Sequence, residues 1–403
     1  MPKHLLLFAA TTGYQIRVFA DAARRVGAEV TLASDRCHVM RDPWGDRAIP
    51  VKFDRIAESI EVLRSLELHV DGVAAVGDKP AVLAAEAAAM YGVPFHSPAA
   101  ARACHDKHVS RQIFEAAGLQ VPAYFRSASE RDAARAPYPC VLKPCGQSAS
   151  KGVIRANNEA EFAAAWRRIA RMGETEIQVE AYIPGREFAV EGLVTHGWLE
   201  PIAIFDKPDP LEGPYFEETI YVTPSRAPAE VQRTLIDTVQ HAVTALGLTH
   251  GPVHAELRYN DDGAWIGEAH ARPIGGLCSR ALRMADAVPL EEMILVHAFG
   301  GDVSMAQLDG PASGVMMIPT PMNGLYRGVE GLDRARAVPW IEDIVVTAAE
   351  GQHFIPPPEG SSYLGFIFAR GETPEAVEAA LRRAHAELKF HFAAALDTFS
   401  PSS

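Results

Sequence analysis

The chain has 403 residues and a formal net charge of −13, with 48% hydrophobic and 22% charged residues. This length suits two or three domains with cores of their own, and the composition is ordinary for a globular protein. The negative charge and the lack of a run rich in Lys and Arg exclude a general nucleic-acid binder.

Targeting and cysteine usage indicate a cytoplasmic protein without a membrane partner. The apolar run at 4–10 is too short for the core of a signal peptide, and no run of about 20 apolar residues is present. The cysteines form no Cys-x-x-Cys pair, and an odd, dispersed set favours a reducing compartment over a disulfide framework. They are Cys37, Cys104, Cys140, Cys145 and Cys278.

The first hundred residues alternate between strand-like and helix-like segments. Residues 5–35 give a strand, a glycine-containing turn, an Ala-rich amphipathic helix and a strand, and residues 69–95 repeat the alternation. Such units predict a small parallel α/β domain. The G-x-G-x-x-G pattern is missing, so a dinucleotide site is not predicted here.

After this region, residues 101–118 are predicted to be helical, and the following strand delivers Lys143 to a loop of small residues at 145–152. Backbone N–H groups of such a loop can approach phosphate oxygens, and an ammonium group nearby neutralises their charge. The glycine spacing is not that of a Walker A loop. A flexible surface loop is the alternative interpretation.

Two carboxylates bracket the next turn. Glu180 ends an apolar strand, and Glu187 opens the strand that follows the Pro184-Gly185 turn. In this arrangement they could bind an adenine amino group and ribose hydroxyls, or they could be solvated charges at the rim of the sheet.

Two strand-like runs, at 253–260 and 264–270, flank an Asn-Asp-Asp-Gly turn signal and predict a β-hairpin. We expect a three-residue loop, 261–263, with Gly263 in the left-handed position. The cross-strand pairs are then Asn260 with Ala264, Glu256 with Glu268, and His254 with His270.

The facing pair Glu256 and Glu268 needs a cation, because like charges opposite each other destabilise a sheet. Mg²⁺, which proteins hold through one or two carboxylates, would supply it. Alternatively, Arg258, Arg272 or a lysine would neutralise the pair as part of an ordinary surface network. Strand alternation places Glu268, His270 and Arg272 on one face, and Gly267, Ala269 and Ala271 on the other.

The last hundred residues contain Pro- and Gly-rich turns between short strands, then a helix at 373–390 with Thr373 as N-cap and Pro374 in its first turn. They predict an α+β closing domain without a reactive cluster.

The order of these motifs resembles the ATP-grasp superfamily of carboxylate ligases. The motifs, over residues 100–300, are Asp106-Lys107, Lys143 with its loop, Glu180 and Glu187, Glu256 and Glu268, and Arg272. The resemblance implies an α/β fold with an N-terminal parallel (Rossmann-like) domain at 1–100, an ATP-grasp domain at 101–300, and a C-terminal α+β domain at 301–403.

The resemblance also implies roles for single residues. Glu256 and Glu268 would hold Mg²⁺, or Mn²⁺ in its place, while Lys143, Arg272 and His270 would serve catalysis. His270 stands where many members have asparagine, and a neutral imidazole suits Mg²⁺ poorly, so we expect it to position a phosphate or the acyl substrate. The ATP contacts would be Lys107, Lys143, Gly146, Ser148, Ser150, Gly152, Glu180, Ala181, Ile183 and Glu187.

Within the superfamily the chain looks most like the L-amino-acid ligases, which join two amino acids through an acyl phosphate. A carboxylate and an amine would be its small-molecule partners, and a homodimer is left open. The alternatives are a biotin-carboxylase-like or nucleotide-biosynthesis-like ligase, and a non-catalytic nucleotide-binding protein. The segment that carries Asp206, Lys207, Tyr215 and Glu217 is either substrate-facing or an exposed connection.

Overall fold

A computed structural model describes residues 2–10, 15–35, 48–303 and 308–394. The turn expected at 11–14 and Cys37 lie outside these residues. The chain forms two compact units, each built from three segments. The first consists of Met1–Pro122, Ile183–Asp206 and Ser225–Asp309, and the second of Ala123–Tyr182, Lys207–Pro224 and Gly310–Ser403. The division into three domains at 100 and 300 stays a prediction.

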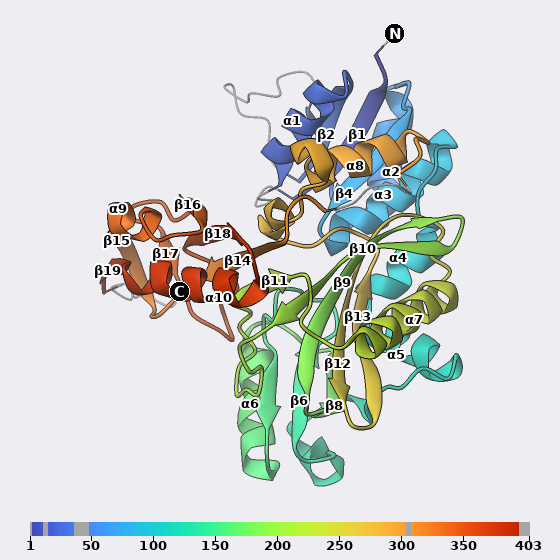
Figure 1. The fold of residues 1–403 in the computed structure, drawn as a ribbon. Coiled ribbons are helices and arrows are strands. Elements are labelled where there is room, and N and C mark those ends of the chain that lie inside the picture. The colour runs from blue at the N-terminus through green and yellow to red at the C-terminus, as the bar shows by residue number, and fades with distance from the viewer. Residues whose placement is uncertain (1, 11–14, 36–47, 304–307, 395–403) are drawn as a thin grey trace, which may run out of the picture. The chain divides into compact units, whose positions relative to one another are not determined.

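The first unit opens with a parallel sheet of strand order β3-β2-β1-β4, drawn in blue in Figure 1. Buried apolar residues of β1 and β4 form its core with the Ala-rich face of α3. The predicted parallel α/β arrangement is therefore confirmed. Its elements are β1 (His4–Ala9), α1 (Ile16–Arg25), β2 (Glu29–Ser34), β3 (Ala48–Pro50), α2 (Ile56–Ser65), β4 (Gly72–Val76) and α3 (Asp78–Tyr91).

The stretch at 101–118 is helical, as predicted, and Asp106 divides it. It forms two helices, α4 (Pro98–His105) and α5 (Lys107–Ala116), which meet at this residue. The Asp106 carboxylate accepts hydrogen bonds from the backbone N–H groups of His108 (2.8 Å) and Val109 (3.1 Å). This is an N-cap, and it places Lys107 at the first position of α5.

The first unit also contains antiparallel strands in the order β13-β12-β9-β10. One face of β12 and β13 is apolar and packs on α5 and α7, where Phe114, Leu235 and Val239 are fully buried. The other face carries the polar residues of the candidate site. The elements are β9 (Arg186–Thr195), β10 (Trp198–Lys207), α7 (Ala229–Leu246), β12 (His250–Asn260), β13 (Gly263–His270) and α8 (Leu290–Ala298).

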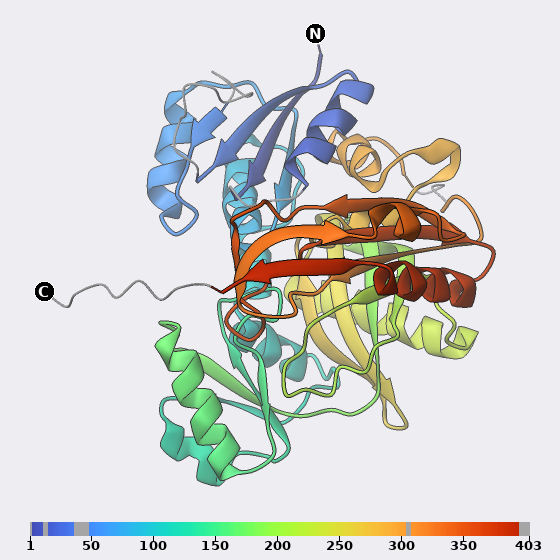
Figure 2. The same ribbon diagram turned by 90° about the vertical axis from the view of Figure 1, so that its left-hand side faces the viewer.

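The second unit contains a sheet of order β5-β8-β6-β7. Helix α6 covers it through Phe162 and Ile169, as Figure 2 shows in green. The elements are β5 (Tyr124–Ser127), β6 (Cys140–Pro144), β7 (Ile154–Ala156), α6 (Glu159–Arg171) and β8 (Ile177–Ala181).

The remainder of the second unit is α+β, as expected. Strands β11-β14-β18-β16 and β17-β15-β19 carry helices α9 and α10. Thr373 caps α10 and Pro374 begins it, but the helix ends at Ala386, and residues 389–393 pair with β15 as a strand. The elements are β11 (Ile220–Thr223), β14 (Ala312–Ile318), β15 (Gly324–Glu330), α9 (Leu332–Arg336), β16 (Ile341–Val346), β17 (His353–Phe354), β18 (Gly365–Gly371), α10 (Pro374–Ala386) and β19 (Lys389–Ala393).

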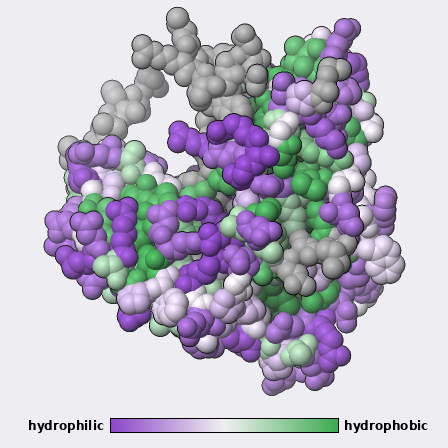
Figure 3. All heavy atoms as spheres, turned by 45° about the horizontal axis from the view of Figure 1, so that its top comes forward, coloured by the Kyte–Doolittle hydropathy of each residue, from purple (hydrophilic) through white to green (hydrophobic). Residues whose placement is uncertain are grey.

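Among the described residues, no helix is both long and apolar enough to cross a bilayer. On the face in Figure 3, hydrophilic side chains interrupt the apolar ones.

Candidate active site

The β12–β13 hairpin brings together the two carboxylates that the sequence analysis paired. Glu256 lies opposite Glu268, and His254 lies opposite His270, as predicted. The predicted loop is wrong, however, because Asn260 pairs with Gly263, so the loop has two residues. The correct pairs result from a second irregularity farther along β13.

That irregularity is a β-bulge at Gly267. Leu257 pairs with Ile266 and Glu256 with Glu268, which leaves Gly267 as the extra residue. The bulge shifts the strand by one residue, so Ile266 faces the apolar core while Glu268 joins the polar face. The guanidinium group of buried Arg111 donates to the carbonyl oxygens of Ile266 (2.6 Å) and Gly267 (2.9 Å), which secures the bulge.

The polar face of the hairpin brings acidic and basic groups close together. Lys107 lies 3.4 Å from Glu268, His270 lies 3.2 Å from the same carboxylate, and His254 lies 3.2 Å from Glu256. The chain therefore supplies cations of its own to the carboxylate pair. The face carries the carboxylates of Asp78, Glu191, Glu256 and Glu268 and the bases Lys107, His254, His270 and Arg272.

Asp78 is central to this network, although the sequence analysis did not select it. It is the first residue of α3, directly after the carboxyl end of the parallel strand β4, where ligand-binding residues often lie. Arg272 donates to both its carboxylate oxygens, over 2.8 and 3.3 Å, and His270 Nδ1 lies 2.8 Å away. Burial alone would raise the pKa of Asp78, but Arg272 and His270 hold it well below its usual value.

His254 donates hydrogen bonds from both ring nitrogens, to Glu191 and Glu256. Burial and the charge of Arg272 lower the pKa of His270, but Asp78 and Glu268 together raise it above its ordinary value. An imidazole nitrogen suits Mg²⁺ less well than a carboxylate oxygen does. Glu256 and Glu268 offer carboxylate oxygens from directly paired, partly exposed positions and fit a hard divalent cation. His270 does not fit as a third ligand.

His254 gives the fold a measurable pH dependence. Burial lowers its pKa, but Glu191 and Glu256 raise it to about 9, above the ordinary 6.5. Its imidazolium therefore stabilises the fold fully below about pH 6.5, and this contribution is lost as the pH rises through about 9. The variant Glu191→Gln should lower the melting temperature at pH 6.5 and reduce its decline from pH 6.5 to 9.5.

Calorimetry at several pH values measures this effect, with Glu230→Gln, an exposed carboxylate of α7, as the control. A decline as steep in Glu191→Gln as in the unmodified chain would contradict the role of the Glu191–His254 pair.

In the second unit, Lys143 and Glu180 form a pair on neighbouring strands. Lys143 Nζ lies 2.8 Å from Glu180 Oε2, and Gln178 Nε2 donates to Glu180 Oε1 over 2.7 Å. Glu180 is only 4% exposed, so its interpretation as a solvated rim charge is wrong. Glu187, in the first unit, pairs with Arg258 at 3.0 Å, and Arg258 also donates to the Ile183 carbonyl over 2.8 Å.

The loop at 145–152 connects β6 to β7. Ala149, Ser150 and Gly152 adopt positive φ angles of 53°, 54° and 74°. A Cβ atom on Gly152 would come within 2.7 Å of the Pro144 ring, so only glycine fits there. The N–H of Gly152 donates to the carbonyl oxygen of Pro358 over 2.8 Å.

Arg168 of α6 links side chains that lie near this loop. Its guanidinium contacts Glu359 at 2.5 and 2.9 Å and the Tyr215 hydroxyl at 2.5 Å. Tyr215 forms a β-bridge with Ile154 in the strand that follows the loop. Part of the 207–224 segment thus borders this sheet. Within the segment, Lys207 is buried and lies 2.5 Å from Glu218.

The contacts of Arg168 with Glu359 and Tyr215 should control how readily the loop at 145–152 opens. Arg168→Met should speed tryptic cleavage after Lys151 several-fold, because Glu359 and Tyr215 would lose their shared partner. Mg-ATP should slow the cleavage in the unmodified chain, as expected for a loop that closes over its ligand.

Time courses by mass spectrometry test both expectations. The matched control is Arg167→Met, which removes an exposed pair with Glu130 from the same helix. Equal cleavage rates in both variants, or no protection by Mg-ATP, would contradict the corresponding part of the prediction.

Comparison with known proteins matches two parts of the chain to described families. Residues 136–281 match the ATP-grasp domain family, and residues 316–393 match the family described as L-amino acid ligase C-terminal domain 2. The solved structure of an L-amino acid ligase from Bacillus licheniformis superimposes with a TM-score of 0.83 at 24% identity, over 97% of this chain and 99% of that one.

Curated relatives show similar levels of sequence identity. The ATP-grasp enzyme fsqD of Aspergillus fumigatus is 24% identical, over 93% of this chain and 76% of its own length. The uncharacterized protein y4rH of Sinorhizobium fredii is 22% identical, over 95% of this chain and 82% of its own length. A D-alanine–D-alanine ligase of Pseudomonas entomophila is 27% identical, but over only 42% of this chain and 54% of that protein.

The chain therefore contains an ATP-grasp domain, at residues 136–281. It is an ATP-dependent ligase that forms carbon–nitrogen bonds, and within the superfamily it is similar to the L-amino acid ligases.

Proposed function

We propose that the protein forms an amide between two amino acids and releases ADP and phosphate. The observation that carries this proposal is the polar face of the hairpin, which holds the Glu256–Glu268 pair. Arg272 follows shortly after the end of β13, and Asp78 binds its guanidinium group. The similarity to L-amino acid ligases and to a D-alanine–D-alanine ligase supports amino acids as substrates.

The proposed reaction begins when a substrate carboxylate attacks the γ-phosphorus of ATP. The bond to the leaving oxygen of ADP breaks, and an acyl phosphate forms. The amine of the second substrate then attacks the acyl carbon, phosphate leaves, and the amine loses a proton. Such phosphoryl transfer needs positioning and charge stabilisation more than covalent chemistry from the protein.

Arg272 is proposed to bind the transferring phosphate. Asp78 fixes the orientation of its guanidinium group, so its donors are arranged before the reaction. Glu256 and Glu268 would hold Mg²⁺, which would supply positive charge to the ATP phosphates. His270, which lies 2.8 Å from Asp78 and 3.2 Å from Glu268 through different ring nitrogens, would position these carboxylates.

Lys107, Lys143 and the loop with Gly146, Ser148, Ser150 and Gly152 are proposed to contact the phosphates. Glu180 is proposed for the adenine and Glu187 for the ribose. The N–H groups of Ala181 and Tyr182 already donate to Ala123 and Pro139. A backbone contact between the adenine and residues 181–183 would therefore use other backbone groups of this segment, including those of Ile183.

Phosphate release tests the proposed function. Mg-ATP is incubated with each pair of the twenty amino acids, with each amino acid alone, and with bicarbonate. We expect release that depends on two amino acids, together with a product whose mass is their sum less one water. Release that depends on bicarbonate, or none with any pair, would overturn the assignment of amino acids.

A further inference from the structure

The first unit contains a cavity of about 390 Å³ that the proposed reaction does not use. This volume lies at the lower end of the usual range of small-molecule pockets, roughly 300–1,000 Å³. It is lined by Pro94, Phe95, Thr195, His196, Glu200, Thr249, His250, His297, Gly300, Gly301, Asp302 and Val303.

The cavity is separate from the polar face of the hairpin. His250 begins β12, whereas Glu256 lies six residues farther along the same strand. At about 3.4 Å per residue, the two positions are about 20 Å apart. A ligand in the cavity would therefore not occupy the proposed metal site.

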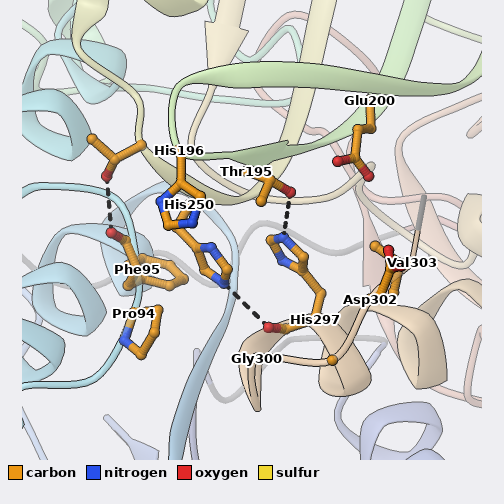
Figure 4. Close-up of a pocket in the computed structure, with 12 residues that line it drawn as sticks. Pro94, Phe95, Thr195, His196, Glu200, His250, His297, Gly300, Asp302 and Val303 are labelled. Carbon is orange, nitrogen blue, oxygen red and sulfur yellow. Dashed lines mark hydrogen bonds between the residues drawn. The ribbon is translucent and has the colours of Figure 1, made fainter.

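The lining is apolar at one end and acidic at the other. Figure 4 shows Pro94 and Phe95 at one end, Glu200 and Asp302 at the opposite end, and the histidines between them. The twelve lining residues, all within the described part of the chain, include neither Lys nor Arg. Glu200 and Asp302 are the acidic side chains of this lining.

The histidines add hydrogen-bond acceptors. His250 Nε2 lies 3.2 Å from the carbonyl oxygen of His297, and because a carbonyl only accepts, this nitrogen donates (Figure 4). Burial lowers the pKa of His250, and burial with the neighbouring histidines lowers that of His297 to about 4. Both rings are thus neutral at neutral pH, which leaves His250 Nδ1 as an acceptor.

The arrangement does not suit a metal ion. Of the described residues, no three in this cavity bring possible ligand atoms within 4.8 Å of one another. The rings of His250 and His297 are stacked, with centroids 3.9 Å apart and an angle of 8° between their planes. Ring nitrogens bind metals in the plane of the ring, so two parallel planes cannot converge on one ion.

We propose that this cavity binds a small organic cation, a primary ammonium group on a short aromatic or alkyl body. The ammonium would donate to Glu200 and Asp302, which are partly buried and exposed respectively. The body would pack on Phe95 and the neutral imidazole rings, whose faces attract cations and apolar groups alike. The site is a second one, in addition to the proposed ligase site.

Isothermal titration calorimetry of the full chain tests this with phenethylammonium as the probe. We expect saturable binding to the unmodified chain, and no comparable binding of 2-phenylethanol or 3-phenylpropionate, which have similar bodies without the positive charge. In Glu200→Gln/Asp302→Asn the Kd should rise at least about 10-fold, the scale of one lost charge-assisted hydrogen bond.

Two controls separate this site from the active site and from surface charge. Glu230→Gln removes an exposed carboxylate of α7 and should bind the probe like the unmodified chain. Glu268→Gln should also bind it normally, whether or not the proposed ligase function holds. The proposal is overturned if phenethylammonium does not bind saturably, if the double variant binds it unchanged, or if Zn²⁺ occupies the cavity and the amine does not.

Discussion

Replacing Glu268 with glutamine should reduce ADP formation by about 10³-fold, the upper range for loss of one preorganised electrostatic group. The substitution keeps the shape of the side chain and removes one of two negative charges that face each other across β12 and β13. A single carboxylate, Glu256, would then bind Mg²⁺ weakly. Coupled detection of ADP measures the loss over a range of Mg²⁺ concentrations.

The fold should survive this change, because the apolar face of the hairpin is untouched. Lys107 and His270 would lose a charged partner, so a modest shift of the melting temperature is expected. Circular dichroism and calorimetry provide the control. Normal turnover in a folded variant would remove Glu268 from the proposed metal site.

The sequence predicted this pair of carboxylates through two errors that cancelled. The predicted loop is one residue too long. The prediction also assumes strict alternation along β13, which contains a bulge. Gly267 carried the missing signal, because glycine inside a strand often marks a bulge. Without the bulge, Glu268 would share the core-facing side of β13 with Ala264 and Ile266.

Spacing along the chain could not predict the partners that arrive from other elements. Asp78 lies 194 residues before Arg272, and Glu191 lies 63 residues before His254, yet each pair is in contact. Such contacts depend on how the strands are ordered in the sheet, which local patterns do not determine. The class of the fold was predictable, since it rests on local alternation and on the order of motifs.

Some interpretations failed for the same reason. Glu180 looks like a rim charge in the sequence, but it is buried because β5 and β6 flank β8 on both sides. Arg168, Glu359 and Tyr215 come from three distant segments, and no spacing rule connects them. Polar residues were thus identified more reliably than their partners.

Arg272 could act as a catalytic guanidinium or as a merely structural charge, and its contacts allow the two roles to be tested. One alternative from the sequence has Arg272 neutralise Glu256 and Glu268. In the structure its Nε and Nη2 donate to Asp78, and its Nη1 donates to the Pro273 carbonyl oxygen. Burial and this pairing keep the guanidinium in one orientation on the polar face. A lysine could match the charge, but not the two-point contact with a carboxylate.

Arg272→Lys should therefore reduce kcat by roughly 10²-fold or more, with little change in thermal stability, if the fork stabilises the transferring phosphate. Steady-state ADP release measures this, and the double variant Asp78→Asn/Arg272→Gln is the decisive control. The double variant removes the charges of Asp78 and Arg272 together. If the Asp78–Arg272 pair is purely structural, turnover should stay near normal. If Arg272 binds the phosphate, the double variant should be at least as impaired as Arg272→Lys. Near-normal turnover in both variants would show that only charge balance matters, because neither variant retains the guanidinium donors.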